Sequence, residues 1–151
     1  MVFAELIEPS LLNWKVWGDQ IFKIEQSIYG KKFLDKETMK SEINNPRVCL
    51  VLLKEGDLVV GFTYALPESK KIAHIIDTAL AKEYQNKGFV SILMSCLENQ
   101  LRKRGYEYIT RRAMVENGYA DKITKNYSGK IVETSEFVGK WGKQRNFKIR
   151  L

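Results

Sequence analysis

The amino-acid sequence predicts a mixed α/β fold, in which a mostly antiparallel sheet of about six to seven strands is flanked by about four helices. Short β-branched apolar runs alternate with segments of helical periodicity. The turn Glu55-Gly56-Asp57 joins two apolar runs as a hairpin. A helical segment separates two strands in the middle of the chain, which requires a right-handed crossover with local parallel pairing. At 151 residues, we expect one domain over residues 1–151.

The chain is expected to begin with a strand over residues 2–7 and a helix. Asp19 is placed to cap this helix, whose apolar residues recur at helical spacing until Gly30. Trp14 and Trp17 precede the cap, and we expect them to pack the helix against the sheet.

A second short helix is predicted from residue 35 or 36 to residue 44, because Pro46 disfavours its continuation. Residues 48–54 and 58–66 form the two strands of the hairpin. The remaining elements, in chain order, are a strand over 71–80, a helix over 88–105, a strand over 106–114, a helix over 117–127, and an antiparallel pair over 131–137 and 145–151.

The composition indicates a globular chain with an anion-attracting surface. The net charge is +7, and the segment 139–150 has five basic residues and no acid: Lys140, Lys143, Arg145, Lys148 and Arg150. Such a surface suits a phosphate-rich ligand, an acidic protein or RNA. The longest apolar run, residues 48–53, is far below the roughly 20 residues that span a bilayer, so we expect no membrane partner.

Cysteine usage predicts the compartment. Cys49 falls in a strand pattern and Cys96 on the apolar stripe of a helix, so both are expected to be core thiols. Since the N-terminus shows no secretory signal, we expect a reduced, cytoplasmic protein.

The turn Gln85-Asn86-Lys87-Gly88-Phe89-Val90 is the strongest functional signal. It leads from a strand into a long helix, whose first N–H groups have no intrahelical partner and carry the positive end of the dipole. Such a helix start suits a phosphate. Gly88 would allow close approach, and Lys87 would add a mobile positive charge.

This stretch resembles the acyl-CoA signature of the GNAT superfamily of N-acyltransferases, Q/R-x-x-G-x-G/A, which follows a strand and begins a helix that ends in a basic-Gly-Tyr/Phe turn. Gln85 and Gly88 match the signature, and Arg104-Gly105-Tyr106 matches the turn. The resemblance extends over about residues 20–137 and includes Ile24-Glu25-Gln26, Asn45-Pro46, Val60-Gly61-Phe62 and Glu116-Asn117-Gly118-Tyr119-Ala120.

The resemblance implies acetyl-CoA as donor, an amine as acceptor and direct attack in a ternary complex. The pyrophosphate would contact the N–H groups from Gln85 to Val90. The pantetheine arm would hydrogen-bond the open strand edge before the loop, at Thr78, Ala79 and Leu80, like an added strand. The N–H of Leu80 could polarise the thioester carbonyl, and the amide of Asn117 would contact the cofactor while also capping its helix. No metal is expected.

Two positions depart from the family pattern. Val90 replaces the last small residue of the signature, so its side chain could crowd the phosphates. The tyrosine that often serves as general acid, seven residues after the asparagine, is Thr124 here. Tyr127, one helical turn further, is a candidate substitute.

Two residues on the preceding strand are candidate general bases. His74 is the only histidine and titrates near neutral pH. Strict alternation places it opposite to Asp77, but a bulge in the strand would exchange the faces downstream, which makes Asp77 a second candidate.

The sequence supports three hypotheses of function. The first is an N-acetyltransferase acting on a small-molecule or peptide amine. The second is an acyltransferase acting on a nucleic-acid-linked amine such as aminoacyl-tRNA, for which the basic tail would bind phosphates. The third is an acyl-CoA-binding module without catalysis. Whether the terminal strand pair forms a homodimer contact is left open.

Overall fold

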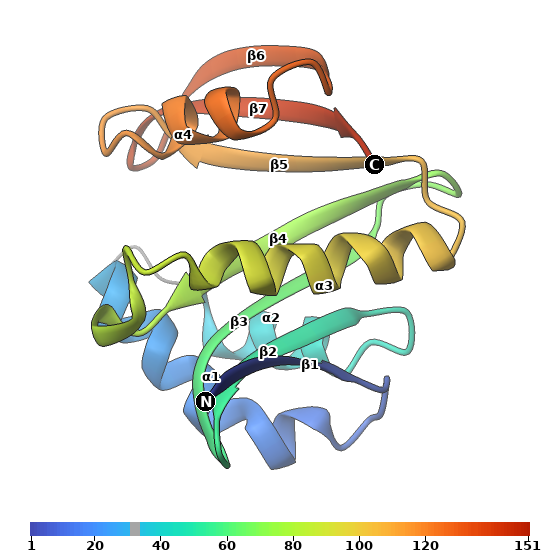
Figure 1. The fold of residues 1–151 in the computed structure, drawn as a ribbon, viewed down its shortest axis with the longest axis vertical. Coiled ribbons are helices and arrows are strands. Elements are labelled where there is room, and N and C mark those ends of the chain that lie inside the picture. Colours follow the sequence, from blue (N-terminus) through green and yellow to red (C-terminus); the bar gives the residue numbers. More distant parts are fainter. Residues whose placement is uncertain (31–33) are drawn as a thin grey trace.

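The computed structural model of the protein describes residues 1–30 and 34–151. Within them, seven strands form one sheet in the order β1-β2-β3-β4-β5-β7-β6, accompanied by four α-helices and the short 3-10 helix η2 (Figure 1). The strands are β1 (Val2–Ile7), β2 (Cys49–Glu55), β3 (Leu58–Pro67), β4 (Ile72–Leu80), β5 (Tyr108–Met114), β6 (Ile131–Gly139) and β7 (Gly142–Arg150). The helices are α1 (Asn13–Tyr29), α2 (Lys36–Ile43), η2 (Lys82–Tyr84), α3 (Phe89–Lys103) and α4 (Tyr119–Asn126).

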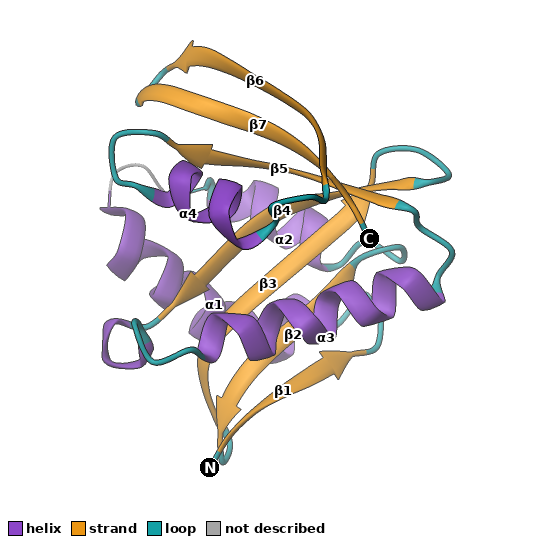
Figure 2. Cartoon of the chain, turned by 45° about the horizontal axis from the view of Figure 1, so that its top comes forward, coloured by secondary structure: helices purple, strands orange, loops and turns teal. Residues whose placement is uncertain are grey.

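The helices cover both faces of the sheet, as Figure 2 shows, so the molecule has two apolar cores. On one face, α3 packs through Leu93 and Leu97 against β1, β2 and β3. On the other face, α1 and α2 pack through Ile21 and Met39. Strand β2 contributes to both cores, because its side chains alternate between faces and all but the last residue are buried.

Among the described strands, the only parallel pair is β4 with β5, and it is short. Pairing extends over Ile72, Ala73 and His74 of β4, ending where His74 faces Thr110. Beyond this point the two strands diverge (Figure 2), while β5 continues to pair with β7 as far as Met114. The expected mixed, mostly antiparallel sheet with a central crossover is therefore confirmed, and its two halves open like a V.

A bulge in β4 determines which side chains face which core. Tyr64 of β3 pairs with Asp77, but the next residue, Ala65, pairs with Ile75, so Ile76 is the extra residue. Ile75 accordingly belongs to the core under α3, whereas Ile76 packs into the core under α1 and α2. The bulge that the sequence analysis considered therefore occurs at Ile76, and it places Asp77 on the face opposite to the one that strict alternation predicts.

Helix α1 begins earlier than predicted. It starts at Asn13, so Asp19 is an interior residue and not the cap, and Trp14 and Trp17 lie within the helix. The start is stabilised from outside the local sequence, since the N–H of Trp14 donates to Oδ1 of Asn44, at the end of α2, at 2.8 Å. The helix-capping preferences of the local sequence give no sign of such a contact.

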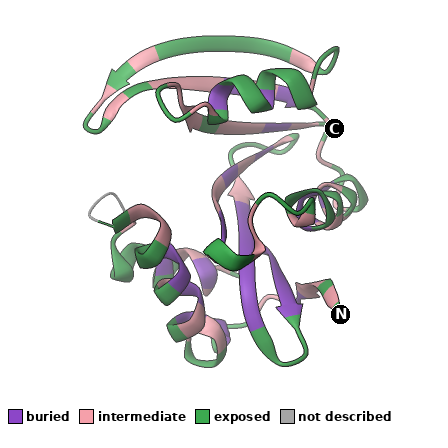
Figure 3. Cartoon of the chain, turned by 60° about the vertical axis from the view of Figure 1, so that its left-hand side comes forward, coloured by how far each residue is buried: buried purple, intermediate pink, exposed green. Residues whose placement is uncertain are grey.

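The C-terminal hairpin is longer than expected, because β6 and β7 meet at a tight turn around Trp141. Figure 3 shows that buried residues concentrate on the central strands, whereas β6 is largely exposed. Of the predicted core thiols, Cys49 is buried and Cys96 is half-buried. No helix among the described residues has the length and apolar character needed to cross a membrane.

Candidate active site

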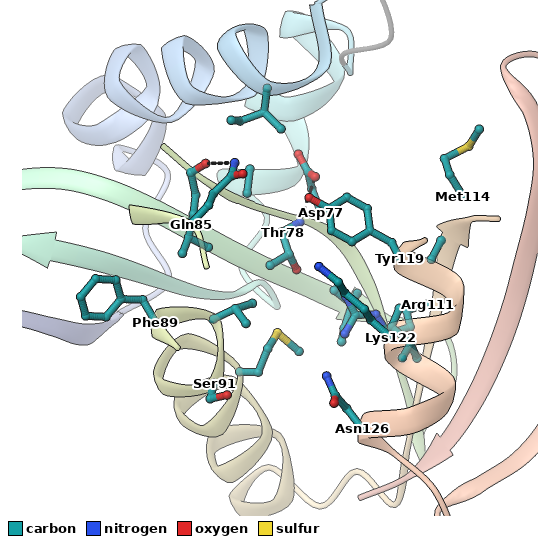
Figure 4. A pocket seen from close by; sticks show the side chains of 18 of the residues that line it. Asp77, Thr78, Gln85, Phe89, Ser91, Arg111, Met114, Tyr119, Lys122 and Asn126 are labelled. Atoms are coloured by element: carbon teal, nitrogen blue, oxygen red, sulfur yellow. Dashed lines mark hydrogen bonds between the residues drawn. The ribbon is translucent and has the colours of Figure 1, made fainter. Parts of the chain in front are cut away.

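A cavity of about 710 Å³ occupies the opening between β4 and β5 and continues between α3 and α4. Figure 4 views this cavity, with Thr78 of β4 on one side and Lys122 and Asn126 of α4 on the other. Its walls combine apolar residues, such as Ile75 and Met94, with a few charged ones. This combination is typical of small-molecule and cofactor sites.

The mouth of the cavity is the loop that leads into α3. Asn86 and Gly88 adopt left-handed conformations, with φ of 59° and 81°, and Gly88 is the N-cap of the helix. In the described part of the chain, the N–H groups from Asn86 to Val90 have no hydrogen-bond partner. Successive free amides at a helix start form an anion-binding concavity.

The side chains of this loop offer fewer groups for binding a ligand than its backbone does. Nε2 of Gln85 donates to the carbonyl of Leu80 at 2.9 Å, so this side chain ties the loop to β4 and not to a ligand. Lys87 does not line the cavity. Val90 lines it and is 44% exposed, and its free N–H is one of the loop amides.

The edge of β4 beside the cavity carries few free backbone groups. The N–H of Ala81 donates to Val60, so by antiparallel alternation Thr78 and Leu80 direct their backbone groups away from β3. The carbonyl of Thr78 accepts from the hydroxyl of Tyr29 at 2.8 Å, and its N–H donates to Asp77 Oδ1. The N–H of Leu80 has no partner among the described residues.

Asp77 lines the cavity and contacts Glu25 of α1. The Glu25 side chain is buried, and its Oε2 accepts from the N–H of Leu34 at 2.9 Å. Glu25 Oε1 and Asp77 Oδ2 are buried without another partner. Burial and the hydrogen bond with Glu25 raise the pKa of Asp77 to about 10, so this carboxyl is protonated at neutral pH.

His74 does not line the cavity. Its Nδ1 lies 2.8 Å from Oγ1 of Thr110, which in turn donates to Glu68. Burial, reinforced by the positive charge of Arg112, lowers the pKa of His74. Of the two predicted bases, the structure therefore brings only Asp77 to the cavity.

Tyr127, Glu98 and Arg111 line the cavity next to one another. The Tyr127 hydroxyl donates to Glu98 Oε2 at 2.6 Å. Burial, with this hydrogen bond, raises the pKa of Tyr127 above its ordinary value. Thr124 does not line the cavity, since its hydroxyl donates to the carbonyl of Ala120.

Comparison with known proteins decides the family. Residues 18–122 match the model of the acetyltransferase (GNAT) family, which is more than half of the chain. The chain belongs to this family. A search of curated proteins finds no match.

Solved structures share the fold of this GNAT chain at low sequence identity. The ribosomal-protein-S18-alanine N-acetyltransferase of Escherichia coli superposes with a TM-score of 0.77 and 16% identity, over 100% of this chain and 93% of that one. An aminoglycoside 6'-N-acetyltransferase complexed with coenzyme A superposes with a TM-score of 0.78 and 14% identity, over 98% of this chain and 96% of that one. A GNAT acetyltransferase from Elizabethkingia anophelis with acetyl-CoA bound superposes with a TM-score of 0.70 and 11% identity, over 99% of this chain and 98% of that one.

The structure brings together most of the predicted site residues of this GNAT chain. Lining the cavity are Asp77, Thr78, Ala79, Leu80, Gln85, Asn86, Gly88, Phe89, Val90, Asn117 and Tyr127. Asn117 precedes the actual N-cap, Gly118, but its Oδ1 accepts from the N–H of Tyr119, so it still stabilises the start of α4.

Several cavity residues were absent from the predicted site. Tyr29, Glu98 and Arg111 come from α1, α3 and β5, and only the fold brings them together. A charged residue inside the apolar pattern of α3 or β5 is the one sequence signal for Glu98 and Arg111. Nothing in the sequence identifies Tyr29. Among the described residues, no three His, Cys, Asp or Glu side chains cluster in the manner of a metal site.

Proposed function

We propose that the protein is an N-acyltransferase that moves an acetyl group from acetyl-CoA to a primary amine, by direct attack in a ternary complex. The observation that carries the proposal is the row of partnerless amides from Asn86 to Val90, within the described residues, at the start of α3, which opens onto the cavity. These amides fit a diphosphate. The free N–H of Leu80, on the part of β4 that β5 does not pair with, fits an amide-bearing arm that extends into the opening between β4 and β5.

Acetyl-CoA would supply the acetyl group as a thioester. The nitrogen of the amine forms a bond to the thioester carbonyl, the carbon–sulfur bond breaks, and the proton released by the nitrogen balances the departing thiolate. Tyr127 keeps its proton at neutral pH because its pKa is raised, so it can act as the acid toward the thiolate. Asp77 lines the cavity beside Glu25, but its carboxyl holds a proton at neutral pH, so it could accept the proton of the amine only in its ionised form at high pH. At neutral pH the proton of the amine passes to water.

The acceptor class is supported by two structural neighbours. One is named for its action on an alanine of ribosomal protein S18, the other for the 6' amine of aminoglycosides. We infer a small-molecule or peptide amine as the acceptor.

The nucleic-acid hypothesis has less structural support. Lys143 and Arg145 of the basic tail pair with Glu136, and Lys148 pairs with Glu133. Three of the five tail cations are therefore engaged within the hairpin. The hypothesis of a binding module without catalysis was motivated by Val90 and Thr124, and Val90 retains a free N–H.

Calorimetry with coenzyme A tests the proposal. We expect binding in the micromolar range for the wild type, and a loss of at least tenfold for Gly88→Ala, because its Cβ would project from the phosphate-facing loop. Gly56→Ala is the matched control, since Gly56 also has positive φ and open space but lies in the β2–β3 turn. Absence of binding at millimolar coenzyme A, or equal loss in both variants, would contradict the proposal.

A further inference from the structure

Arg111 is a charged residue at this cavity that the proposed chemistry does not use. Among the described residues, only three side chains have a buried polar atom without a hydrogen-bond partner, namely Glu25, Asp77 and Arg111. The first two lie side by side, and because Asp77 keeps its proton, the pair avoids holding two negative charges. The Nε of Arg111 has no such explanation, and removing a cation from water without a counter-charge is unfavourable.

The groups beside Arg111 are Tyr127, which hydrogen-bonds its guanidinium, and Glu98. Arg111 forms no ion pair with any described carboxylate. Its nearest acid is Glu98, whose Oε2 is occupied by the Tyr127 hydroxyl and whose Oε1 lies 3.8 Å from Arg102. Burial lowers the pKa of Arg111, and the neighbouring Tyr127 and Glu98 oppose this effect only in part.

Two further cations line the cavity. Arg112 of β5 and Lys122 of α4 form no ion pair among the described residues. Their charged ends lie over the rings of Phe137 and Tyr119, at 5.6 and 5.5 Å from the centroids. Asp77, which also lines the cavity, keeps its proton at physiological pH, so the Asp77–Glu25 pair carries at most one negative charge. The three cations Arg111, Arg112 and Lys122 therefore make the cavity favourable for a negatively charged ligand group.

The position of Arg111 separates this group from the phosphates of the donor. Arg111 directly follows Thr110, the last β5 residue paired with β4, so it lies where the V closes. Its neighbour Glu98 is nine residues beyond Phe89, which places it about 14 Å from the start of α3 at 1.5 Å per residue. Arg111 therefore lies away from the loop amides proposed to bind the phosphates and beside Tyr127, the residue proposed to protonate the thiolate, so in the proposed function it is near the acyl group of the donor.

We propose that Arg111 binds the terminal carboxylate of a dicarboxylic acyl group, so that the enzyme prefers a carboxylated thioester such as succinyl-CoA over acetyl-CoA. This inference rests on the proposed function and specifies its donor. The planar guanidinium matches a carboxylate with two parallel hydrogen bonds. In the transfer the amine nitrogen bonds to the thioester carbonyl and the thiolate leaves with a proton. The distal carboxylate is unchanged, so no other reactant is required.

Calorimetry with coenzyme A, acetyl-CoA and succinyl-CoA tests the inference without an acceptor. For the wild type we expect succinyl-CoA to bind at least tenfold more tightly than acetyl-CoA. Arg111→Met should bring this ratio close to one. Arg111→Lys should give an intermediate ratio, because lysine keeps the positive charge but lacks the paired N–H donors of the guanidinium. Arg150→Met, which removes an exposed cation at the end of β7, should leave the ratio unchanged.

The outcomes separate the inference from the function on which it rests. Coenzyme A binding with a wild-type ratio near one overturns the inference and leaves the proposed function standing, whereas no coenzyme A binding removes both. An equal loss for all three ligands in Arg111→Met also overturns the inference, because Arg111 would then act on a part common to every donor. If circular dichroism shows that Arg111→Met is unfolded, the ratio in Arg111→Lys decides: a fall supports the inference and an unchanged ratio overturns it.

Discussion

Asp77 shows how one residue couples the fold to the chemistry of the site. The bulge at Ile76 turns its carboxyl toward α1, where Glu25 is already buried. Two carboxyls in one desolvated site cannot both be ionised without a large cost, so the pair retains a proton at neutral pH. A cationic amine that enters the cavity would meet this pair.

This pair predicts a pH dependence of stability. The pKa of Asp77 is about 10 in the folded state against an ordinary value of 3.8, so between these values the folded chain binds a proton that the unfolded chain has released. The free energy of unfolding should therefore fall as pH rises from 5 to 9, by at most about 1.4 kcal/mol per pH unit from this group. Asp77→Asn, which resembles the protonated acid, should flatten this decline in urea titrations.

The matched control for this measurement is Asp57→Asn, because Asp57 is exposed in the β2–β3 turn. Its stability should follow the wild-type dependence on pH. A wild-type slope retained in Asp77→Asn would show that the carboxyl is already ionised in the folded protein.

Tyr127 carries the second residue-level prediction. Since its pKa is raised by burial and by Glu98, the hydroxyl remains protonated throughout the neutral range. If it protonates the thiolate, Tyr127→Phe should lower kcat by about 10²-fold or more with little change in KM for acetyl-CoA, because the interaction is made in the transition state. Tyr106→Phe, outside the cavity, is the control. An unchanged kcat in steady-state assays would show that the thiolate leaves unassisted.

Among the elements, α1 positions both Glu25 and Tyr29 at the site, and its start depends on a distant residue. Oδ1 of Asn44 accepts the N–H of Trp14 and so performs the function of a cap. Asn44→Ala should destabilise the protein by about 1 kcal/mol in urea unfolding, because a helix-terminal N–H loses its acceptor.

Asn99→Ala is the comparison for this prediction, since Asn99 is exposed on α3 and bonds only the Arg102 side chain in the described part of the structure. Its effect should stay within about 0.5 kcal/mol, as for most surface substitutions. Equal stability of Asn44→Ala and the wild type would indicate that water replaces the cap without cost.

Across the whole molecule, the net charge of +7 suggests more cations available to bind phosphates than the basic tail offers in the folded structure. The acids of β6 and α4 neutralise Lys143, Arg145 and Lys148, which leaves Lys140 and Arg150 in the tail without an ion pair among the described residues. Charge patterns along the sequence do not show this compensation, since the paired residues face each other across the hairpin.

Single-stranded RNA binding tests this view of the surface. With two available tail cations, the logarithm of the binding constant should fall with the logarithm of salt at a slope of about −1.4. A slope near −3.5, measured by fluorescence anisotropy, would require about five phosphate contacts and would restore the nucleic-acid hypothesis.

The sequence by itself determined the order of the elements, the hairpin, the crossover and the phosphate-facing turn. These are local properties, because periodicity, turn residues and helix starts are encoded over a few neighbouring positions. For the same reason the turn from Gln85 to Val90 is recognisable as a candidate site from its own residues, and all of them but Lys87 line the cavity.

The tertiary structure alone decided the face of Asp77 and its contact with Glu25, the exclusion of His74, and the assembly of Tyr29, Glu98 and Arg111 around one cavity. These features depend on contacts between distant segments, as the bulge at Ile76 depends on the register between β3 and β4. The start of α1, which rests on a contact with α2, and the ion pairs of the basic tail, which form across the hairpin with β6, were likewise decided by the tertiary structure. Burial and partner geometry set the charge of these side chains, and neither is encoded in local propensity.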